Sequence, residues 1–144
     1  MPKKFQFRLE QVLKIKSHYA NLAKDLLNQV VLLRTNKESE INNQEEYRTH
    51  CLAKKVIINK ASHLQTQWYH ILHINDTIHQ LEYEKKQLLE IENLRRRQLT
   101  AAMKEEKILE KLKDKKKLLH EEMVRHEETK ILDEISHNKF LKKS

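Results

Sequence analysis

The sequence predicts an all-α protein in which two long helices form an antiparallel coiled-coil hairpin, with an extended C-terminal helix. Three observations predict this fold class. Glycine is absent from the 144 residues and there is one proline, Pro2. Apolar residues recur at spacings of three and four along most of the chain, and 35% of all residues are charged. Because compact folds need glycine for left-handed turns and helix C-caps, long paired helices with narrow apolar stripes are the remaining architecture.

The first helix is expected at about residues 5–54. In a coiled coil, the a and d positions face the partner helix, and apolar residues three, four or seven apart are assigned to them. For this helix they are Val12, Tyr19, Ala23, Leu26, Val30 and Leu33. The residues between them are mostly Lys, Glu, Gln, Asn and Arg, so the helix needs a partner to be stable.

A turn is expected at about residues 55–61. Val56, Ile57 and Ile58 are consecutive β-branched residues, which weaken a helix, and Asn59 tolerates a left-handed conformation. The chain is thus expected to form a single coiled-coil domain.

The second helix is expected at about residues 62–139. Its a and d positions are assigned to Leu64, Trp68, Ile71, Ile74, Ile78, Leu81 and Leu88, and near its end to Leu109, Leu112, Leu119 and Met123. With the turn near residue 58, Phe5 is expected to lie opposite about residue 111, and the residues beyond that point extend past the first helix.

Composition excludes several classes of function. Without glycine there is no phosphate-cradling loop, so neither bound nucleotide nor any other cofactor is expected. One cysteine, Cys51, excludes an internal disulfide and fits a reducing compartment. The apolar runs are too short to span a bilayer, and Lys3 and Lys4 are followed by FQFRLE instead of the apolar core of a signal peptide. No metal site and no catalytic site is expected, because a two-helix protein offers no enclosed cavity for histidines and does not bury carboxylates.

The charge is divided along the second helix, although the net charge is +8. Lys85–Lys117 contains twelve basic and six acidic residues, whereas Glu121–Ile135 contains two basic and six acidic residues. The triplets Arg95–Arg97 and Lys115–Lys117 do not form compact patches, because successive helix residues point about 100° apart. The acidic residues Glu92, Glu110 and Asp114 lie close to the triplets in the sequence, and no aromatic residues are placed to stack on bases. A protein-docking or solvated surface is therefore expected, and no nucleic-acid partner.

Aromatic residues flank the expected turn. Tyr47, Trp68 and Tyr69 are brought close together if the chain folds back there. They either close the end of the coil as a cluster or form a contact site for a partner, since Trp and Tyr dominate binding hot spots.

The two ends of the chain carry a family resemblance. FQFRLEQVLKIK, at residues 5–16, resembles the opening F-x-F-x-L-E-x-V-L of FliJ-type flagellar export proteins. EKILEKLKDKKK, at residues 106–117, followed by HEE, ILDEI and Phe140, resembles the closing pattern of that family.

This resemblance implies a non-catalytic, cytoplasmic stalk of the flagellar type III export apparatus, held at the inner face of the cell membrane. The implied partners are the hexameric export ATPase, the membrane export gate protein and export chaperones, and the implied protein is a monomer. It implies an ATPase contact at Phe5, Phe7, Leu9, Lys111, Lys113, Lys115, Lys116, Glu121, Asp133 and Glu134. It implies an export-gate contact at Tyr47, Trp68 and Leu72. A virulence-type secretion stalk and a generic dimeric coiled-coil scaffold are the alternatives.

Overall fold

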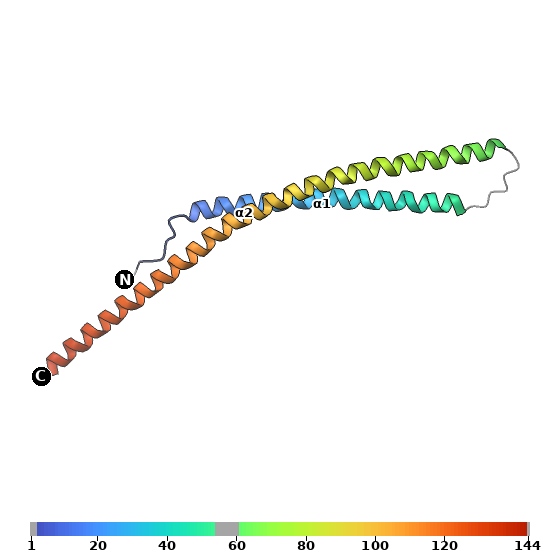
Figure 1. Cartoon of the computed structure of the whole chain (residues 1–144). Helices are drawn as coiled ribbons and strands as arrows, with labels where there is room; N and C mark the ends of the chain where they lie inside the picture. The colour runs from blue at the N-terminus through green and yellow to red at the C-terminus, as the bar shows by residue number, and fades with distance from the viewer. Residues whose placement is uncertain (1–2, 54–60, 144) are drawn as a thin grey trace. The chain divides into compact units, whose positions relative to one another are not determined.

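The computed structural model describes residues 3–53 and 61–143, and nearly all of them are helical. Helix α1 spans Glu10–Ala53 and helix α2 spans Ala61–Lys143 (Figure 1). No strand occurs within the two described ranges. The all-α fold class with two long, mutually packed helices is confirmed. The turn expected at 55–61 lies outside the described residues, except for Ala61, which begins α2.

Helix α1 begins at Glu10, so the expectation that it begins near Phe5 was wrong. Phe5, Phe7 and Leu9 are half-buried, whereas Gln6 and Arg8 are exposed. This alternation has a period of two and not the period of a helix, and the structure gives residues 3–7 no regular secondary structure and residues 8–9 a turn. The carboxylate of Glu10 in the first turn favours a helix start there, because it faces the positive end of the helix dipole.

The packing of α1 on α2 divides the chain into two units, which are described separately. The terminal unit comprises the described residues up to Asn21 together with those from Ala101 onward. In it the helices run antiparallel, because Glu10 pairs with Lys113 at 2.8 Å and Lys16 pairs with Glu105 at 2.8 Å.

This alignment corrects the expected register. The ring of Phe5 lies 5.7 Å from that of His120, measured between centroids, and not opposite about residue 111. Glu10 pairs with Lys113, so the residues before Glu10 lie beside residues of α2 that come after Lys113. A turn centred at residue 58 would instead place Phe5 opposite about residue 111.

The middle unit comprises Leu22–Thr100. Its helices are also antiparallel: Lys37 pairs with Glu84 at 2.7 Å, and Arg48 donates a hydrogen bond of 2.9 Å to the amide oxygen of Asn75. Its apolar core consists of Leu27, Val30, Ile41, Ile74, Ile78 and Leu81.

The buried face of α1 lies one residue further along the sequence than expected. Leu13, Ala20 and Leu27 are buried, whereas the expected Val12, Tyr19, Leu26 and Leu33 are exposed. Val30 is buried as expected and Ala23 is half-buried. Apolar residues occupy both neighbouring stripes of α1, so the period alone does not identify which stripe faces α2.

The face of α2 was predicted correctly in its centre. Ile74, Ile78 and Leu81 are buried, and Ile71, Leu88, Leu109 and Leu112 are half-buried. At the two ends the assignment was wrong, because Leu64, Trp68, Leu119 and Met123 are exposed.

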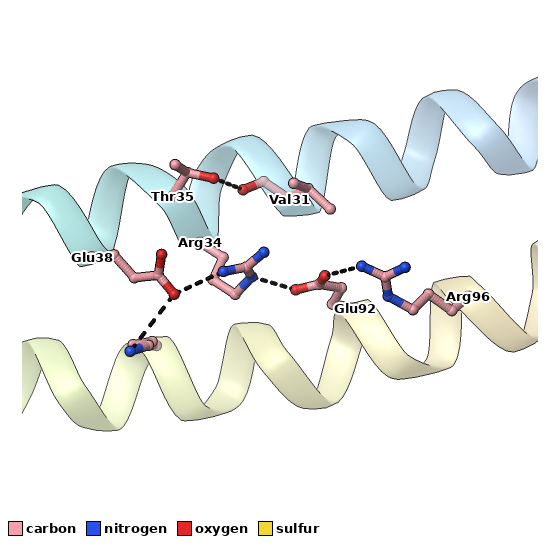
Figure 2. A network of polar contacts seen from close by, with 7 residues as sticks. Val31, Arg34, Thr35, Glu38, Glu92 and Arg96 are labelled. Atoms are coloured by element: carbon pink, nitrogen blue, oxygen red, sulfur yellow. Dashed lines mark hydrogen bonds and ion pairs between the residues drawn. The ribbon is translucent and has the colours of Figure 1, made fainter.

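Charged side chains occupy interface positions in the middle unit (Figure 2). Glu92 is only 3% exposed and accepts hydrogen bonds from Nε of Arg34 at 2.5 Å and from Arg96 at 2.7 Å. Arg34 also donates to Glu38 at 2.7 Å, and Lys85 of α2 lies 3.7 Å from the same carboxylate. The network therefore joins α1 to α2 at one defined alignment.

The protonation equilibria of this unit reflect these pairs. Hydrogen bonds from Arg96 and then Arg34 lower the pKa of the Glu92 carboxyl, although its burial acts in the opposite direction. The hydrogen bond with Glu92, followed by that with Glu38, raises the pKa of Arg34. The hydrogen bonds from Lys37 and then Gln80 lower the pKa of Glu84. Each shift favours the charged form that makes the interhelical contact.

Candidate functional site

The first candidate surface, here called the terminal site, lies where residues 3–9 run along α2 in the terminal unit. A groove of about 860 Å³ lies between them, lined by the segment itself and by side chains of α2 that include Leu112, Lys116, Leu119 and Met123. All residues of this segment line the groove, and among them Phe5, Phe7 and Leu9 are half-buried. The terminal site thus joins aromatic and aliphatic side chains with lysine and arginine.

The cationic residues expected to bind a partner have three different positions. Lys116 lines the groove together with Phe5, Phe7 and Leu9. Lys113 pairs with Glu10, so it holds the two helices together and is only partly available. Lys111 and Lys115 are exposed on α2, away from the groove lining.

The acidic residues expected at this surface extend along the end of α2. Glu121 lines a shallow hollow with Lys3, His120 and Arg125. Asp133 and Glu134 are exposed, in a stretch where every described side chain from residue 126 to 142 is exposed. The exposed apolar residues there include Ile131, Leu132, Ile135 and Phe140. This fully exposed stretch of α2 begins later than the sequence suggested, because residues 3–9 lie along α2 between Leu112 and Met123.

The second candidate surface, here called the Trp68 site, lies in the middle unit. Trp68 is 62% exposed and lines an apolar groove of about 570 Å³ with Leu52, Leu64 and Ile71. Leu72 is 39% exposed and does not line this groove. The sequence did not single out Leu52. Leu64 and Trp68 are four residues apart on one helix face, and both were assigned to the helix interface.

Tyr47 has a different partner from the one expected. Its ring meets that of His70 edge-on, with centroids 5.6 Å apart, and its hydroxyl lies 3.1 Å from Nε2 of His70. The neighbouring Cys51 side chain is the largest cause of the raised pKa of Tyr47. The contacts of the described residues therefore join Tyr47 to His70, while Trp68 belongs to the groove.

Other kinds of site find little support in the part of the chain that the structure describes. Residues 3–53 and 61–143 contain no group of three His, Cys, Asp or Glu side chains that could hold a metal ion. Within the same residues, no helix has the length and apolarity required to cross a membrane. Arg95 and Arg96 are occupied by Gln98 and Glu92, which divides the arginine triplet.

The fold and these two surfaces define a helical-hairpin protein that presents exposed apolar and charged side chains to partners. A family model described as "Flagellar FliJ protein" matches residues 5–144, and the chain belongs to the FliJ family. It is therefore a flagellar export-associated protein. No curated protein and no solved structure matches it.

Proposed function

We propose that this protein is a non-catalytic stalk and escort component of the flagellar type III export apparatus. It couples the hexameric export ATPase to the membrane export gate and binds export chaperones. The observation that supports this proposal is a family match over residues 5–144, combined with two long helices that leave apolar side chains exposed at the terminal and Trp68 sites. The protein acts in the cytoplasm as a monomer and reaches the inner face of the membrane through its partners.

The terminal site is proposed to bind the ATPase. Its groove offers Phe5 and Phe7 beside lysines, and the exposed end of α2 adds Ile131, Leu132 and acidic residues. Aromatic and aliphatic side chains surrounded by charges of both signs are typical of protein interfaces.

A pull-down with the purified export ATPase tests this assignment. Deletion of residues 126–144 removes the exposed end of α2 and leaves the Glu10–Lys113 and Lys16–Glu105 pairs in place. Binding is expected to fall at least tenfold while helicity per residue stays the same. Full ATPase binding by the shortened chain contradicts the assignment of the ATPase to this part of α2. Phe5→Ala combined with Phe7→Ala then tests the groove itself.

The Trp68 site is proposed to bind the export gate through Tyr47, Trp68 and Leu72. Trp68→Ala is expected to weaken gate binding at least tenfold, because a Trp in an apolar groove is a typical hot spot. Tyr83→Ala is the matched control, since Tyr83 is 59% exposed on the same helix and lies outside the groove lining. Equal loss from both variants, or loss of helicity in Trp68→Ala, means that Trp68 has no specific role in the contact.

Sedimentation of the free protein separates the stalk from a dimeric scaffold. The interface between α1 and α2 already contains Leu27, Ile74 and the Arg34–Glu92 pair, so each helix has its partner within the chain. A monomer is expected over a wide concentration range. An obligate dimer with parallel helices contradicts the proposal.

A further inference from the structure

One face of α2 in the terminal unit combines unpaired lysines with exposed aliphatic side chains. This basic stripe consists of Lys104, Lys107, Ile108, Lys111, Lys115 and Leu118, all exposed. At about 100° per residue, these six positions fall within about 50° of one line along the helix. Ile108 is 66% exposed and Leu118 is 52% exposed, so the apolar atoms face solvent together with the lysines.

The lysines of the basic stripe are available for a partner. Among the described residues, none of its four lysines makes an ion pair, in contrast to Lys16 and Lys113 of the same unit. Helix α1 covers the other side of α2, where Glu106 accepts a hydrogen bond from Ser17 at 3.1 Å. Between residues 104 and 118, the acidic residue nearest in direction is Asp114, about 70° from the line of the stripe by the same helical period. One turn beyond Leu118, the exposed Glu122 lies within about 10° of that line, so the stripe ends there.

We propose that the basic stripe binds the surface of an anionic membrane, with α2 lying flat on the lipid headgroups. Each lysine beside an anionic bilayer strengthens binding by about fivefold. A lysine also has a long apolar stem that lies along the headgroup region while its ammonium group stays hydrated. Ile108 and Leu118 would enter the boundary between headgroups and acyl chains, as the apolar side chains of interfacial helices do.

The composition of the stripe favours a membrane over a protein or a nucleic acid. Protein interfaces are depleted in lysine and enriched in aromatic residues and arginine, and the stripe has four lysines and none of the others. The two hollows described above for the terminal unit are lined by residues 3–9 and their neighbours on α2, and no residue of the stripe lines either of them. Nucleic-acid surfaces add aromatic side chains that stack on bases or arginines that read them, and both are absent from the stripe.

Vesicle co-sedimentation of the full chain tests the proposal. The protein is expected to bind vesicles of phosphatidylglycerol and phosphatidylcholine in equal parts at low salt, and not vesicles of phosphatidylcholine alone. Replacing the four lysines by glutamine is expected to lower the partition coefficient by about a hundredfold or more. The matched control replaces Lys14, Lys24, Lys116 and Lys117 by glutamine, which removes the same charge from positions outside the stripe and is expected to cost less than about fivefold. Ile108→Gln is expected to weaken binding further at raised salt, when screening leaves mainly the apolar contribution.

Three results would overturn the proposal. The first is no binding to the anionic vesicles at low salt, and the second is equal loss from the two four-lysine variants. The third is tighter binding of a DNA duplex than of vesicles through the same four lysines, which would make the stripe a nucleic-acid surface. Lys111 and Lys115 are also in the set proposed to contact the ATPase, but the vesicle experiment contains no ATPase. Failure of either experiment therefore leaves the other result unchanged.

Discussion

The Glu92 carboxylate allows the interhelical network to be tested by one isosteric change. Glu92→Gln keeps the shape of the side chain but removes its charge and one acceptor oxygen. The residue is 3% exposed and accepts from Arg34 at 2.5 Å and from Arg96 at 2.7 Å. A hydrogen bond to a charged group contributes about 1.5–3 kcal/mol, but Arg96 is more than half exposed and contributes at the low end. We expect the free energy of unfolding at neutral pH to fall by about 1–3 kcal/mol.

The same variant predicts a pH dependence with a definite sign. The pKa of Glu92 is lowered in the folded protein, chiefly by Arg96, so the ionised carboxylate favours the folded state. Its stabilisation is fully present above the ordinary carboxyl pKa of 4.5 and is lost as the pH falls through the lowered folded value. The difference between the original chain and Glu92→Gln is therefore expected to shrink as the pH falls below 4.5.

Urea unfolding followed by circular dichroism, repeated from neutral to acidic pH, measures both effects. Glu90→Gln is the matched control, because Glu90 is exposed on the same helix and makes no ion pair among the described residues. A control as damaging as Glu92→Gln would refute the reasoning. So would a difference that stays constant from neutral to acidic pH.

Three further predictions concern single side chains. Glu84→Gln should destabilise the protein at neutral pH but not at strongly acidic pH, because Lys37 lowers the pKa of Glu84 and protonation removes the same contact; urea unfolding at both pH values checks this. Phe5→Ala should raise amide hydrogen exchange at the start of α1, where Glu10 donates to the carbonyl of Phe7 at 3.1 Å, without changing exchange in the middle unit. The fluorescence of Trp68, the one tryptophan, should be quenched by acrylamide nearly as fast as free tryptophan, and shielding in the free protein would contradict the exposed groove.

The fold class was predictable because its signal is repeated along the whole chain. Missing glycine and persistent spacings of three and four leave few alternatives to paired helices. The start of α1 was missed because apolar spacings of three and four do not mark where a helix begins. The alternation of apolar and polar residues in FQFRL was the local signal against a helix. Alternation over five residues is a short signal beside a long helical one.

The candidate sites were less predictable, because they depend on which side chains are left uncovered. Trp68 fits the helical period of the interface and was assigned to it, yet it is 62% exposed beside Leu52. The charged residues Arg34, Lys37 and Glu92 occupy interface positions that a hydrophobic pattern cannot identify. Their partners lie on the other helix, so their role follows from the alignment of α1 with α2 and not from local sequence.

Two adjacent leucines of α1 test that alignment directly. Leu26 and Leu27 have the same helix propensity and nearly the same sequence environment, so Leu→Ala changes the intrinsic helix preference equally at both positions. The structure buries Leu27 to 8% exposure and leaves Leu26 39% exposed, whereas the apolar spacing assigned Leu26 to the interface. Leu27→Ala is therefore expected to lower the free energy of unfolding by about 2–4 kcal/mol. Leu26→Ala is expected to lower it by less than about 1 kcal/mol.

The order of the two values decides which stripe of α1 faces α2. Urea unfolding of both variants at neutral pH measures it, and the matched chemistry removes propensity as an explanation. A larger loss from Leu26→Ala would mean that α1 is rotated by about 100° from the orientation in the structure. That orientation is incompatible with the observed Arg34–Glu92 pair. Equal losses would mean that α1 has no single buried stripe, and then the network around Glu92 could not fix one alignment of the two helices.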